Sequence, residues 1–492
     1  MNTYQQLIGN EWCDPASDAW IDQVEPFSGE VWARVPRSNA EDADRAVRAA
    51  HKAFNSTAWT SLSATDRGAL LRKLASLIER DAEKLGHIEQ RSNGKLIVEV
   101  AGQMRHAAQW VYYYAGLADK VMGNVIPMPK PGVFNFTRHE PLGVVLAITP
   151  WNSPIALTIW KLAPALAAGN TMVLKPSEFT SASTYELGRL CVEAGFPPGV
   201  VNVVSGYGAE VGEPLSSHPL VAKIAFTGGE IGGKHVNIAA AKDFKHVTME
   251  LGGKSANIVF DDADIDQAVK GAIAGIFSAA GQTCMAGSRL LLQDTIHDAF
   301  VDKLVAEVKK ARIGDPSDPD TQIGPISNRP HFEKVLSYID IAKNEGANCV
   351  LGGHAITGPG YGQGQFVAPT IFTGVNNSMR IAQEEVFGPV LSVIRFKTME
   401  EALEIANDTN YGLAGAVWTR DLHRALYCVE RIRAGTVWVN NYRATSFATP
   451  FGGYKRSGIG REGGAEAIKE YLQTKSVWIT TQPNRANPFA LG

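Results

Sequence analysis

The chain has 492 residues, which is enough for roughly three domains of ordinary size. Hydrophobic residues make up 45% of it and charged residues 20%, a balance that excludes a disordered or fibrous chain. The formal net charge of −3 gives no electrostatic basis for binding nucleic acid or an anionic membrane, so we expect a small molecule as the main ligand.

The predicted elements follow one another in a simple order. Residues 40–116 carry apolar positions at helical spacing, and residues 121–139 are typical of a β-hairpin. From 143 to 260 short apolar strands alternate with helices, and a similar rhythm resumes from 263 to about 440. This alternation predicts two α/β domains with parallel sheets covered on both faces. An alternating run at 476–481 predicts one more strand, which lacks an obvious pairing partner, as does the hairpin.

Cysteine spacing and the start of the chain bear on metal content and location. The five cysteines are scattered and none belongs to a Cys-x-x-Cys pair, so we expect no metal site and no disulfide framework. Such thiols are typical of a reducing compartment. The opening stretch MNTYQQLIGNEW lacks the basic and apolar regions of a signal peptide, and no window approaches about 18 uninterrupted apolar residues. We therefore expect a soluble, cytoplasmic protein.

One cysteine has unusual neighbours. A lone cysteine is usually a small buried apolar residue, and Cys191 in LGRLCVEAG fits that interpretation. Cys284 in GQTCMAGSR lies instead among small and polar residues, which leave room around the sulfur. A nucleophilic role would require thiolate character, supplied by a helix N-terminus or a nearby base. The spacing alone leaves both interpretations open.

Two polar residues follow predicted strands, where α/β proteins place their sites. Glu250 in TMELGGKS precedes two glycines that permit close approach of a ligand, although a solvated glutamate at a strand end is the plainer interpretation. Asn152 in TPWNSP could cap the following helix or donate a hydrogen bond to an oxyanion.

Glycine-rich stretches suggest a phosphate site. FTGGEIGG (226–233) follows a strand and opens a helix, where a phosphate would meet the helix N-terminus. GYGAEVG (206–212) is weaker, and neither stretch matches Gly-x-Gly-x-x-Gly in full context. Lys175 and Glu178 in LKPSE end another strand, where they could hold ribose hydroxyls or lie on the surface.

Taken together, the motifs resemble those of the aldehyde dehydrogenase superfamily in order and spacing, over nearly the whole chain. They are PWN, KPSE, FTG, MELGGKS, GQTCMAGSR, EEVFGPV and PFGGYKRSGIGREGG. The resemblance implies that Cys284 is the nucleophile, that Asn152 donates to the oxyanion together with the Cys284 backbone N–H, and that Glu250 is the general base. Lys161 resembles a lysine that the family often uses in a proton relay.

The resemblance also implies an NAD site and a mechanism. The thiolate attacks the aldehyde carbon, the thiohemiacetal passes a hydride to NAD, and water activated by Glu250 hydrolyses the thioester. Glu178 at a ribose 2′-hydroxyl favours NAD over NADP. Where the family often has a serine, this chain has Gly229, so backbone N–H groups would hold the pyrophosphate. The implied cofactor residues are Ile148, Thr149, Pro150, Trp151, Lys175, Ser177, Glu178, Gly208, Phe226, Thr227, Gly228, Gly229, Leu251, Gly252, Glu385 and Phe387.

The substrate is less determined than the reaction. Trp160, Tyr442, Phe447 and Phe451 could line an aromatic tunnel for an aromatic or medium-length aldehyde, or could pack in the core. Arg443 could bind the carboxylate of a semialdehyde, or could be solvated or pair with a neighbouring subunit. Family members that transfer the acyl group to coenzyme A generally lack a glutamate at the position of Glu250, so that reaction is the alternative. A non-catalytic nucleotide-binding relative is disfavoured because Cys284, Glu250 and Asn152 are all present.

The implied fold is α/β, with a Rossmann-like cofactor domain, an α/β catalytic domain and a β-hairpin oligomerisation platform. The NAD-binding domain would take residues 1–118, 142–252 and 457–471, and the catalytic domain residues 253–456. Residues 119–141 and 472–492 would form the platform. Strand addition across a subunit boundary would then satisfy the unpaired strand edges, so we expect a homodimer or homotetramer.

Overall fold

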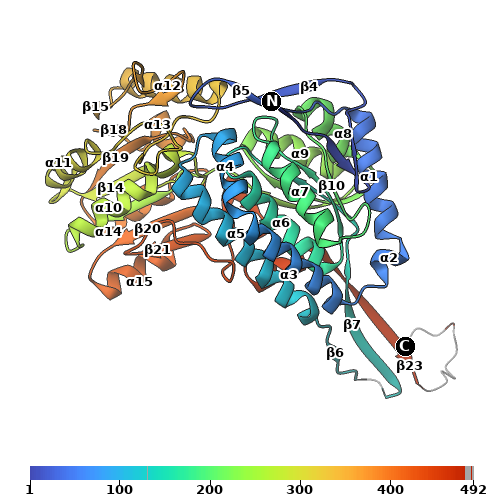
Figure 1. Ribbon diagram of the computed structural model, residues 1–492. Coiled ribbons are helices and arrows are strands. Elements are labelled where there is room, and N and C mark those ends of the chain that lie inside the picture. Colours follow the sequence, from blue (N-terminus) through green and yellow to red (C-terminus); the bar gives the residue numbers. More distant parts are fainter. Residues whose placement is uncertain (130, 482–488, 490–492) are drawn as a thin grey trace.

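A computed structural model describes residues 1–129, 131–481 and 489 (Figure 1). The expected oligomerisation segments are therefore described only in part. Residue 130 of the segment 119–141 lies outside the described residues, as do residues 482–488 and 490–492 of the segment 472–492. No helix in the described ranges is long and apolar enough to cross a membrane.

The N-terminal third contains the predicted helices. Two of them begin with capping boxes, in which Asn39 and Asp42, and likewise Ser63 and Asp66, satisfy each other's backbone N–H groups. Gly94 ends a third helix in the left-handed conformation, with φ 75°. The helices are α1 (Ala40–Phe54), α2 (Thr57–Thr60), α3 (Ala64–Arg80), α4 (Ala82–Asn93) and α5 (Ile97–Leu117), followed by a short 3₁₀ turn at Ala118–Lys120.

An eight-stranded sheet forms the core of the first α/β unit. Its order is β22 (Gly458–Ile459), β12 (His246–Glu250), β11 (Val221–Thr227), β8 (Val144–Ile148), β9 (Thr171–Lys175), β10 (Val201–Val203), β2 (Gln6–Ile8) and β3 (Glu11–Cys13). The five central strands are parallel, as predicted, but the edge strands β22, β2 and β3 pair antiparallel and make the sheet mixed. The connecting helices are α6 (Pro154–Ala168), α7 (Ala182–Ala194), α8 (Glu213–Ser217) and α9 (Glu230–Lys242).

A seven-stranded sheet forms the core of the second unit. Its order is β15 (Asn348–Leu351), β18 (Thr370–Thr373), β19 (Val390–Phe396), β14 (Arg289–Gln293), β13 (Ala256–Val259), β20 (Ala414–Trp418) and β21 (Thr436–Val439). All pairings except that of β15 are parallel, and the strands are apolar runs because both faces are buried. The helices of this unit are α10 (Ile265–Ile276), α11 (His297–Val308), α12 (Arg329–Asn344), α13 (Arg380–Gln383), α14 (Met399–Asn407) and α15 (Leu422–Arg431).

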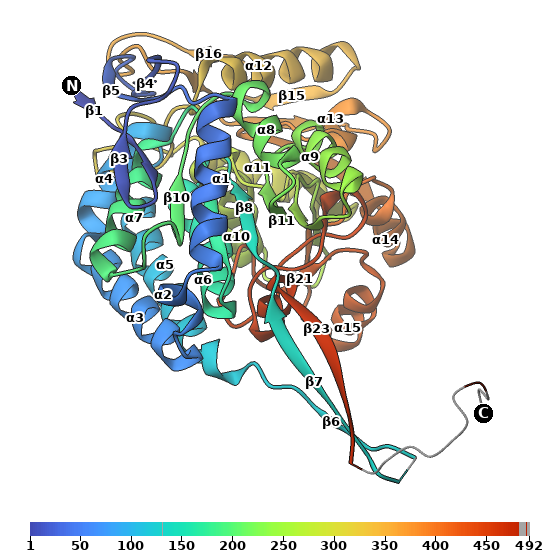
Figure 2. The same cartoon turned by 90° about the vertical axis from the view of Figure 1, so that its right-hand side faces the viewer.

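The predicted hairpin and the predicted C-terminal strand form one three-stranded sheet. The hairpin is β6 (Val125–Ile126) with β7 (Val133–Pro141), and β23 (Leu472–Thr480) pairs antiparallel with β7 over nine residue pairs. The expectation that the C-terminal strand lacks a partner is therefore wrong, because the sequence alone does not reveal a pairing across more than 330 residues. In both views the sheet extends away from the rest of the molecule (Figures 1 and 2).

Smaller pieces complete the fold. A three-stranded sheet joins β1 (Asn2–Thr3), β5 (Val31–Pro36) and β4 (Trp20–Val24), and a ribbon pairs β16 (Ala355–Ile356) with β17 (Phe366–Val367).

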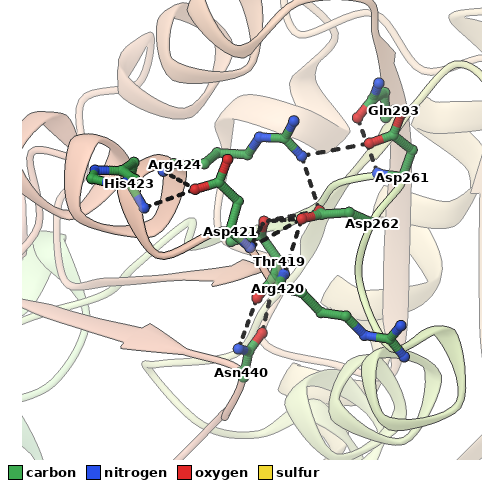
Figure 3. Close-up of polar contacts among 9 residues, drawn as sticks. All are labelled: Asp261, Asp262, Gln293, Thr419, Arg420, Asp421, His423, Arg424 and Asn440. Atoms are coloured by element: carbon green, nitrogen blue, oxygen red, sulfur yellow. Dashed lines mark hydrogen bonds and ion pairs between the residues drawn. The ribbon is translucent and has the colours of Figure 1, made fainter.

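A polar network fastens the carboxyl ends of β13, β20 and β21 (Figure 3). Asp262, after β13, accepts hydrogen bonds from Thr419 Oγ1 at 2.8 Å and the Arg424 guanidinium at 2.9 Å. The Asn440 side chain, after β21, bonds both the N–H and the carbonyl of Thr419. Asp421 caps α15 at the same place. The network fixes the point where the chain leaves β21.

Candidate active site

The site lies where the two large sheets meet. Glu250 ends β12 and Asn152 follows β8, so both come from the carboxyl edge of the first sheet. Cys284 precedes β14 and therefore comes from the amino edge of the second sheet. Two cavities meet at these residues, and both are lined by Asn152, Leu157, Thr227, Glu250 and Cys284. The sequence predicted all three central residues, and the fold brings them to one place.

A tight turn presents Cys284. Ala279 and Ala280 adopt left-handed backbone conformations, with φ 52° and 50°, ahead of Gly281 at 72°. A Cβ on Gly281 would lie 2.1 Å from the Gly388 carbonyl oxygen, so only glycine fits this turn. Burial raises the pKa of the Cys284 thiol to about 12, and the nearby carboxyl groups of Glu385 and Glu250 add to the rise. The sulfur is therefore a neutral thiol at neutral pH and needs a base to become a nucleophile.

The Asn152 amide is anchored to the cysteine loop. Its Nδ2 atom donates a hydrogen bond of 3.0 Å to the Gln282 carbonyl, two residues before Cys284. An amide nitrogen carries two hydrogens, so the second remains for the cavity that Asn152 and Cys284 share. The N-cap of α6 is Ser153, so Asn152 does not act as the helix cap. This arrangement is suited to an oxyanion donor.

Glu250 is a buried carboxyl group beside a lysine–glutamate pair. It is 4% exposed, and neither of its oxygens has a hydrogen-bond partner among the residues that the structure describes. Burial raises the pKa of Glu250 well above its usual value, and Glu462 raises it further, while Lys161 and Arg461 oppose the rise. Lys161 donates 2.6 Å and 2.5 Å hydrogen bonds to Thr227 and Glu462. The sequence analysis had not singled out Glu462, which lies 301 residues from Lys161 along the chain.

The first cavity, of about 180 Å³, has the features of a nicotinamide site. Glu385 accepts a 3.0 Å hydrogen bond from the Gly253 N–H, and a Cβ on Gly252 would lie 2.2 Å from Glu385 Oε2. Phe387, with φ 62°, contacts the Trp151 ring at 5.4 Å between centroids. Nine predicted cofactor residues line this cavity: Pro150, Trp151, Thr227, Gly228, Gly229, Leu251, Gly252, Glu385 and Phe387.

Two further residues of this cavity, His331 and Lys334, were not predicted. Both belong to α12, three positions apart, so they lie on the same side of the helix. His331 Nε2 donates a 2.6 Å hydrogen bond to the Phe387 carbonyl. Burial lowers the pKa of His331 to about 4, so the ring is neutral at neutral pH. In the sequence only the three-residue spacing of His331 and Lys334 places them on one side of a helix. Many surface residues have the same spacing, so it does not single these two out.

A third cavity, of about 610 Å³, follows the start of α9 and fits an adenosine. Of the predicted residues, Ile148, Lys175, Gly208 and Phe226 line it. Lys175 Nζ donates to the Pro176 carbonyl at 3.0 Å. The other three predicted residues, Thr149, Ser177 and Glu178, do not line it. Ser177 Oγ bonds Glu178 at 3.2 Å, and the Thr149 N–H bonds the Lys175 carbonyl.

The N-terminus of α9 lies between the two cofactor cavities. Its N-cap is Gly229, which offers no side-chain cap, and a Cβ there would meet no atom of the described chain within 4 Å. The first N–H groups of the helix are therefore open to an anion such as a pyrophosphate. The residues present fit a dinucleotide. Within the described ranges no group of three or more His, Cys, Asp or Glu side chains could hold a metal ion.

The second cavity, of about 510 Å³, opens toward the surface and fits a substrate. Trp160, Phe451 and Arg443 line it as predicted, and the first two rings contact each other at 5.4 Å between centroids. Tyr442 and Phe447 lie behind its wall instead. The Tyr442 hydroxyl donates to the Met285 carbonyl at 3.1 Å, and Phe447 packs on the Tyr113 ring at 5.2 Å, so packing explains both.

Charged side chains also line this cavity. Arg443 donates a 3.2 Å hydrogen bond to the Ala274 carbonyl and forms no ion pair with any described carboxylate. Lys95 and Glu99, from the α4–α5 corner, were not predicted. Lys95 Nζ donates to Ser153 Oγ at 2.5 Å, and Glu99 accepts a 3.0 Å bond from the Ala279 N–H. The lining of this cavity therefore combines Arg443 and Lys95 with the carboxyl groups of Glu99, Glu250 and Glu462.

Comparisons with known proteins agree with this geometry. Residues 12–477 match the model of the aldehyde dehydrogenase family. The (Z)-2-((N-methylformamido)methylene)-5-hydroxybutyrolactone dehydrogenase of Acinetobacter baylyi is 45% identical over 481 residues, which cover 97% of each chain. The betaine aldehyde dehydrogenase of Bacillus subtilis is 44% identical over 98% of this chain and 99% of its own. A crystal structure of Staphylococcus aureus betaine aldehyde dehydrogenase in complex with NAD⁺ has a TM-score of 0.97 at 42% identity, covering 99% of this chain and 97% of that one.

Proposed function

The chain belongs to the aldehyde dehydrogenase family and oxidises an aldehyde to a carboxylic acid with NAD, and we propose that Cys284, Asn152, Glu250 and Lys161 carry the reaction. The observation that carries this proposal is the meeting of Cys284, Asn152 and Glu250 at the junction of two cavities, one fitted to a nicotinamide and one to a substrate.

Each protein group has a defined task. Glu250 or a water beside it takes the thiol proton, and the Cys284 sulfur then bonds to the aldehyde carbon. The developing oxyanion accepts hydrogen bonds from the free Asn152 N–H and the Cys284 backbone N–H. Bound NAD accepts the hydride that leaves this carbon. Glu250 first releases the thiol proton through Lys161 and Glu462 and is ionised again. It then takes a proton from water, which attacks the thioester carbon, and the Cys284 thiolate leaves and regains a proton as the free acid forms.

A single assay tests the function. NADH formation is followed with short aliphatic, aromatic and carboxylated aldehydes, with NAD or NADP, and with or without coenzyme A. We expect turnover that does not need coenzyme A, because Glu250 supports hydrolysis. Turnover only in the presence of coenzyme A would establish the acyl-transferring alternative, and NAD binding without any turnover would support the non-catalytic one.

We propose a preference for NAD over NADP. Glu178 is bonded to Ser177 and comes three residues after Lys175, which lines the adenosine cavity. A carboxylate at the ribose 2′-hydroxyl would accept a hydrogen bond from it and repel a 2′-phosphate. Lys175 offsets part of that repulsion, since it lines the same cavity. In the assay above, a higher kcat/KM with NAD is the expected result, and equal values would overturn the preference.

The substrate we propose is an aldehyde with a carboxylate at its far end, of the semialdehyde class. Trp160 and Phe451 offer apolar contact to its body, and Arg443 and Lys95 in the same lining offer positive charge. A half-buried arginine without an ionic partner in the described chain is suited to a charged ligand.

Replacing Arg443 with leucine should raise KM for carboxylated aldehydes by about 10- to 100-fold, the range expected for losing a hydrogen bond to a charged group. KM for neutral aldehydes of similar length should change by less than about twofold. Steady-state kinetics on matched pairs of aldehydes measure both. Arg433→Leu, at an exposed arginine outside the cavity, is the matched control. An equal rise for neutral and carboxylated aldehydes would refute the role of Arg443.

We also propose the domain division expected from the sequence, with residues 1–118, 142–252 and 457–471 in the NAD-binding domain and residues 253–456 in the catalytic domain. We propose that the three-stranded sheet joins copies of the chain, and that the enzyme is cytoplasmic. The β23 strand forms an open edge of that sheet, and Trp478 and Ile479 on it are 62% and 44% exposed. An exposed edge with large apolar side chains is typical of strand pairing between copies.

Light scattering at micromolar concentration should therefore give the mass of a homodimer or homotetramer. The double variant Trp478→Glu with Ile479→Lys places a charge at each of the two exposed positions. It should shift the population toward the monomer. Scattering by the unmodified chain that matches 53.0 kDa would overturn the proposal.

A further inference from the structure

The corner between α4 and α5, around residues 93–96, is hydrogen-bonded to the loop that carries Asn152. Asn93 Nδ2 donates a 3.3 Å hydrogen bond to the Asn152 carbonyl, and both residues are buried. Asn93 Oδ1 in turn accepts a 3.0 Å bond from the Lys95 N–H. Lys95 Nζ reaches the next residue of the loop, Ser153, at 2.5 Å. Two consecutive loop residues are thus held by one corner.

A third residue of the corner region replaces the usual helix cap. Ser153 is the N-cap of α6 but makes no side-chain cap bond within the described chain, and Pro154 has no N–H. The first free N–H is that of Ile155, and it donates to Glu89 Oε2 from α4 at 3.2 Å. A carboxylate at a helix N-terminus is favoured by the helix dipole. Glu89 is fully buried, which raises the pKa of its carboxyl to about 7, while the charge of Lys95 and the Ile155 N–H oppose that rise.

We infer that Glu89, Asn93 and Lys95 form a clamp that positions Asn152 for the oxyanion. The inference rests on the proposed role of Asn152. The clamp fixes the backbone of the loop from one side, while the bond to the Gln282 carbonyl fixes the side-chain amide from the other. With both ends held, the second N–H of the amide keeps one direction in the cavity. The three clamp residues are positioning residues, since they act through Asn152.

A double-mutant cycle tests the clamp. Asn93→Ala should lower the rate of NADH formation in a single turnover, at saturating aldehyde and NAD, by about 10- to 100-fold, the effect of a small displacement of a catalytic group. In the Asn152→Ala background the same substitution should change that rate by less than about twofold. Asn93→Ala should leave the dissociation constant for NAD, measured by calorimetry, unchanged both in the wild-type and in the Asn152→Ala background.

Two further variants separate positioning from folding. Asn93→Asp keeps the acceptor for the Lys95 N–H and removes the donor to Asn152, so it should reproduce most of the loss even if Asn93→Ala does not fold. Asn202→Ala is the matched control, because Asn202 is also buried and donates to two carbonyls, of Met172 and Gly199, away from the cavities. It should lower the melting temperature and leave the single-turnover rate intact.

The outcomes are distinct. Equal losses from Asn93→Ala with and without Asn152 would overturn the clamp while leaving the proposed function standing. A single-turnover rate that does not respond to Asn152→Ala would overturn both the oxyanion role and the clamp. A loss in the Asn202→Ala control as large as that in Asn93→Ala would show that stability alone explains the effect, and this too would overturn the clamp.

Discussion

Replacing Cys284 with alanine is expected to lower NADH formation by about 10⁴-fold or more with every aldehyde, because without the sulfur no covalent intermediate can form. NAD should still bind, since Cys284 is a single residue in the wall of the first cavity and does not line the third. Steady-state assays give the rate, and calorimetry gives the dissociation constant for NAD.

Cys191→Ala serves as the matched control. Cys191 is a buried thiol in α7, among the apolar residues that pack around it, and it lines none of the three cavities. The substitution should affect stability and leave turnover in place. Residual turnover of Cys284→Ala within about tenfold of the wild type would contradict covalent catalysis by this residue.

Glu250→Gln is expected to separate the two halves of the reaction. Hydride transfer needs the thiolate and the oxyanion donors, whereas hydrolysis of the thioester needs a base for water. The variant should therefore show a burst of about one NADH per active site, followed by a steady rate lower by about 10²- to 10⁴-fold. Rapid-mixing absorbance resolves the burst, and mass spectrometry should find the acyl group on Cys284.

The pH dependence follows from the burial of Glu250. A base works only when ionised, and burial with the neighbouring Glu462 raises the pKa of Glu250 well above the usual carboxyl range. The hydrolytic rate of the wild type should therefore increase as the pH rises through that raised pKa. The slow steady rate of Glu250→Gln should not show this increase. A Glu250→Gln protein without any burst would show that Glu250 is also required to activate the thiol.

The fold was largely predictable because its strands are short apolar runs between helices with recognisable ends, as β8 and the Gly169 C-cap of α6 illustrate. The edges of the sheets were not. β22 is two residues long, and β23 finds its partner β7 more than 330 residues away, so local pattern carries little information about either. Nothing near residues 476–481 in the sequence indicates that they pair with the hairpin.

The site divides in the same way. Glu250 and Asn152 follow strands, and Cys284 has small neighbours, so each has a local signal. Lys95 has none, and Glu462 lies within the motif PFGGYKRSGIGREGG without any local sign that it pairs with Lys161. Both act through partners that the chain brings together from distant positions. Tyr442 looked equivalent to Phe451 in the sequence, but the direction of an aromatic ring depends on the packing around it, and Tyr442 points to the core.

The polar network around Asp262 bears on how this enzyme can diverge (Figure 3). It anchors the chain at Asn440, three residues before Arg443, while pairing between Phe451 and Glu462 holds the chain again beyond the loop. Between these two anchors Tyr442 and Phe447 pack against the core, and the other residues can change without loosening either sheet. New substrate preferences can therefore evolve by exchanging a short, replaceable module, while the reacting groups and the cofactor site are inherited intact.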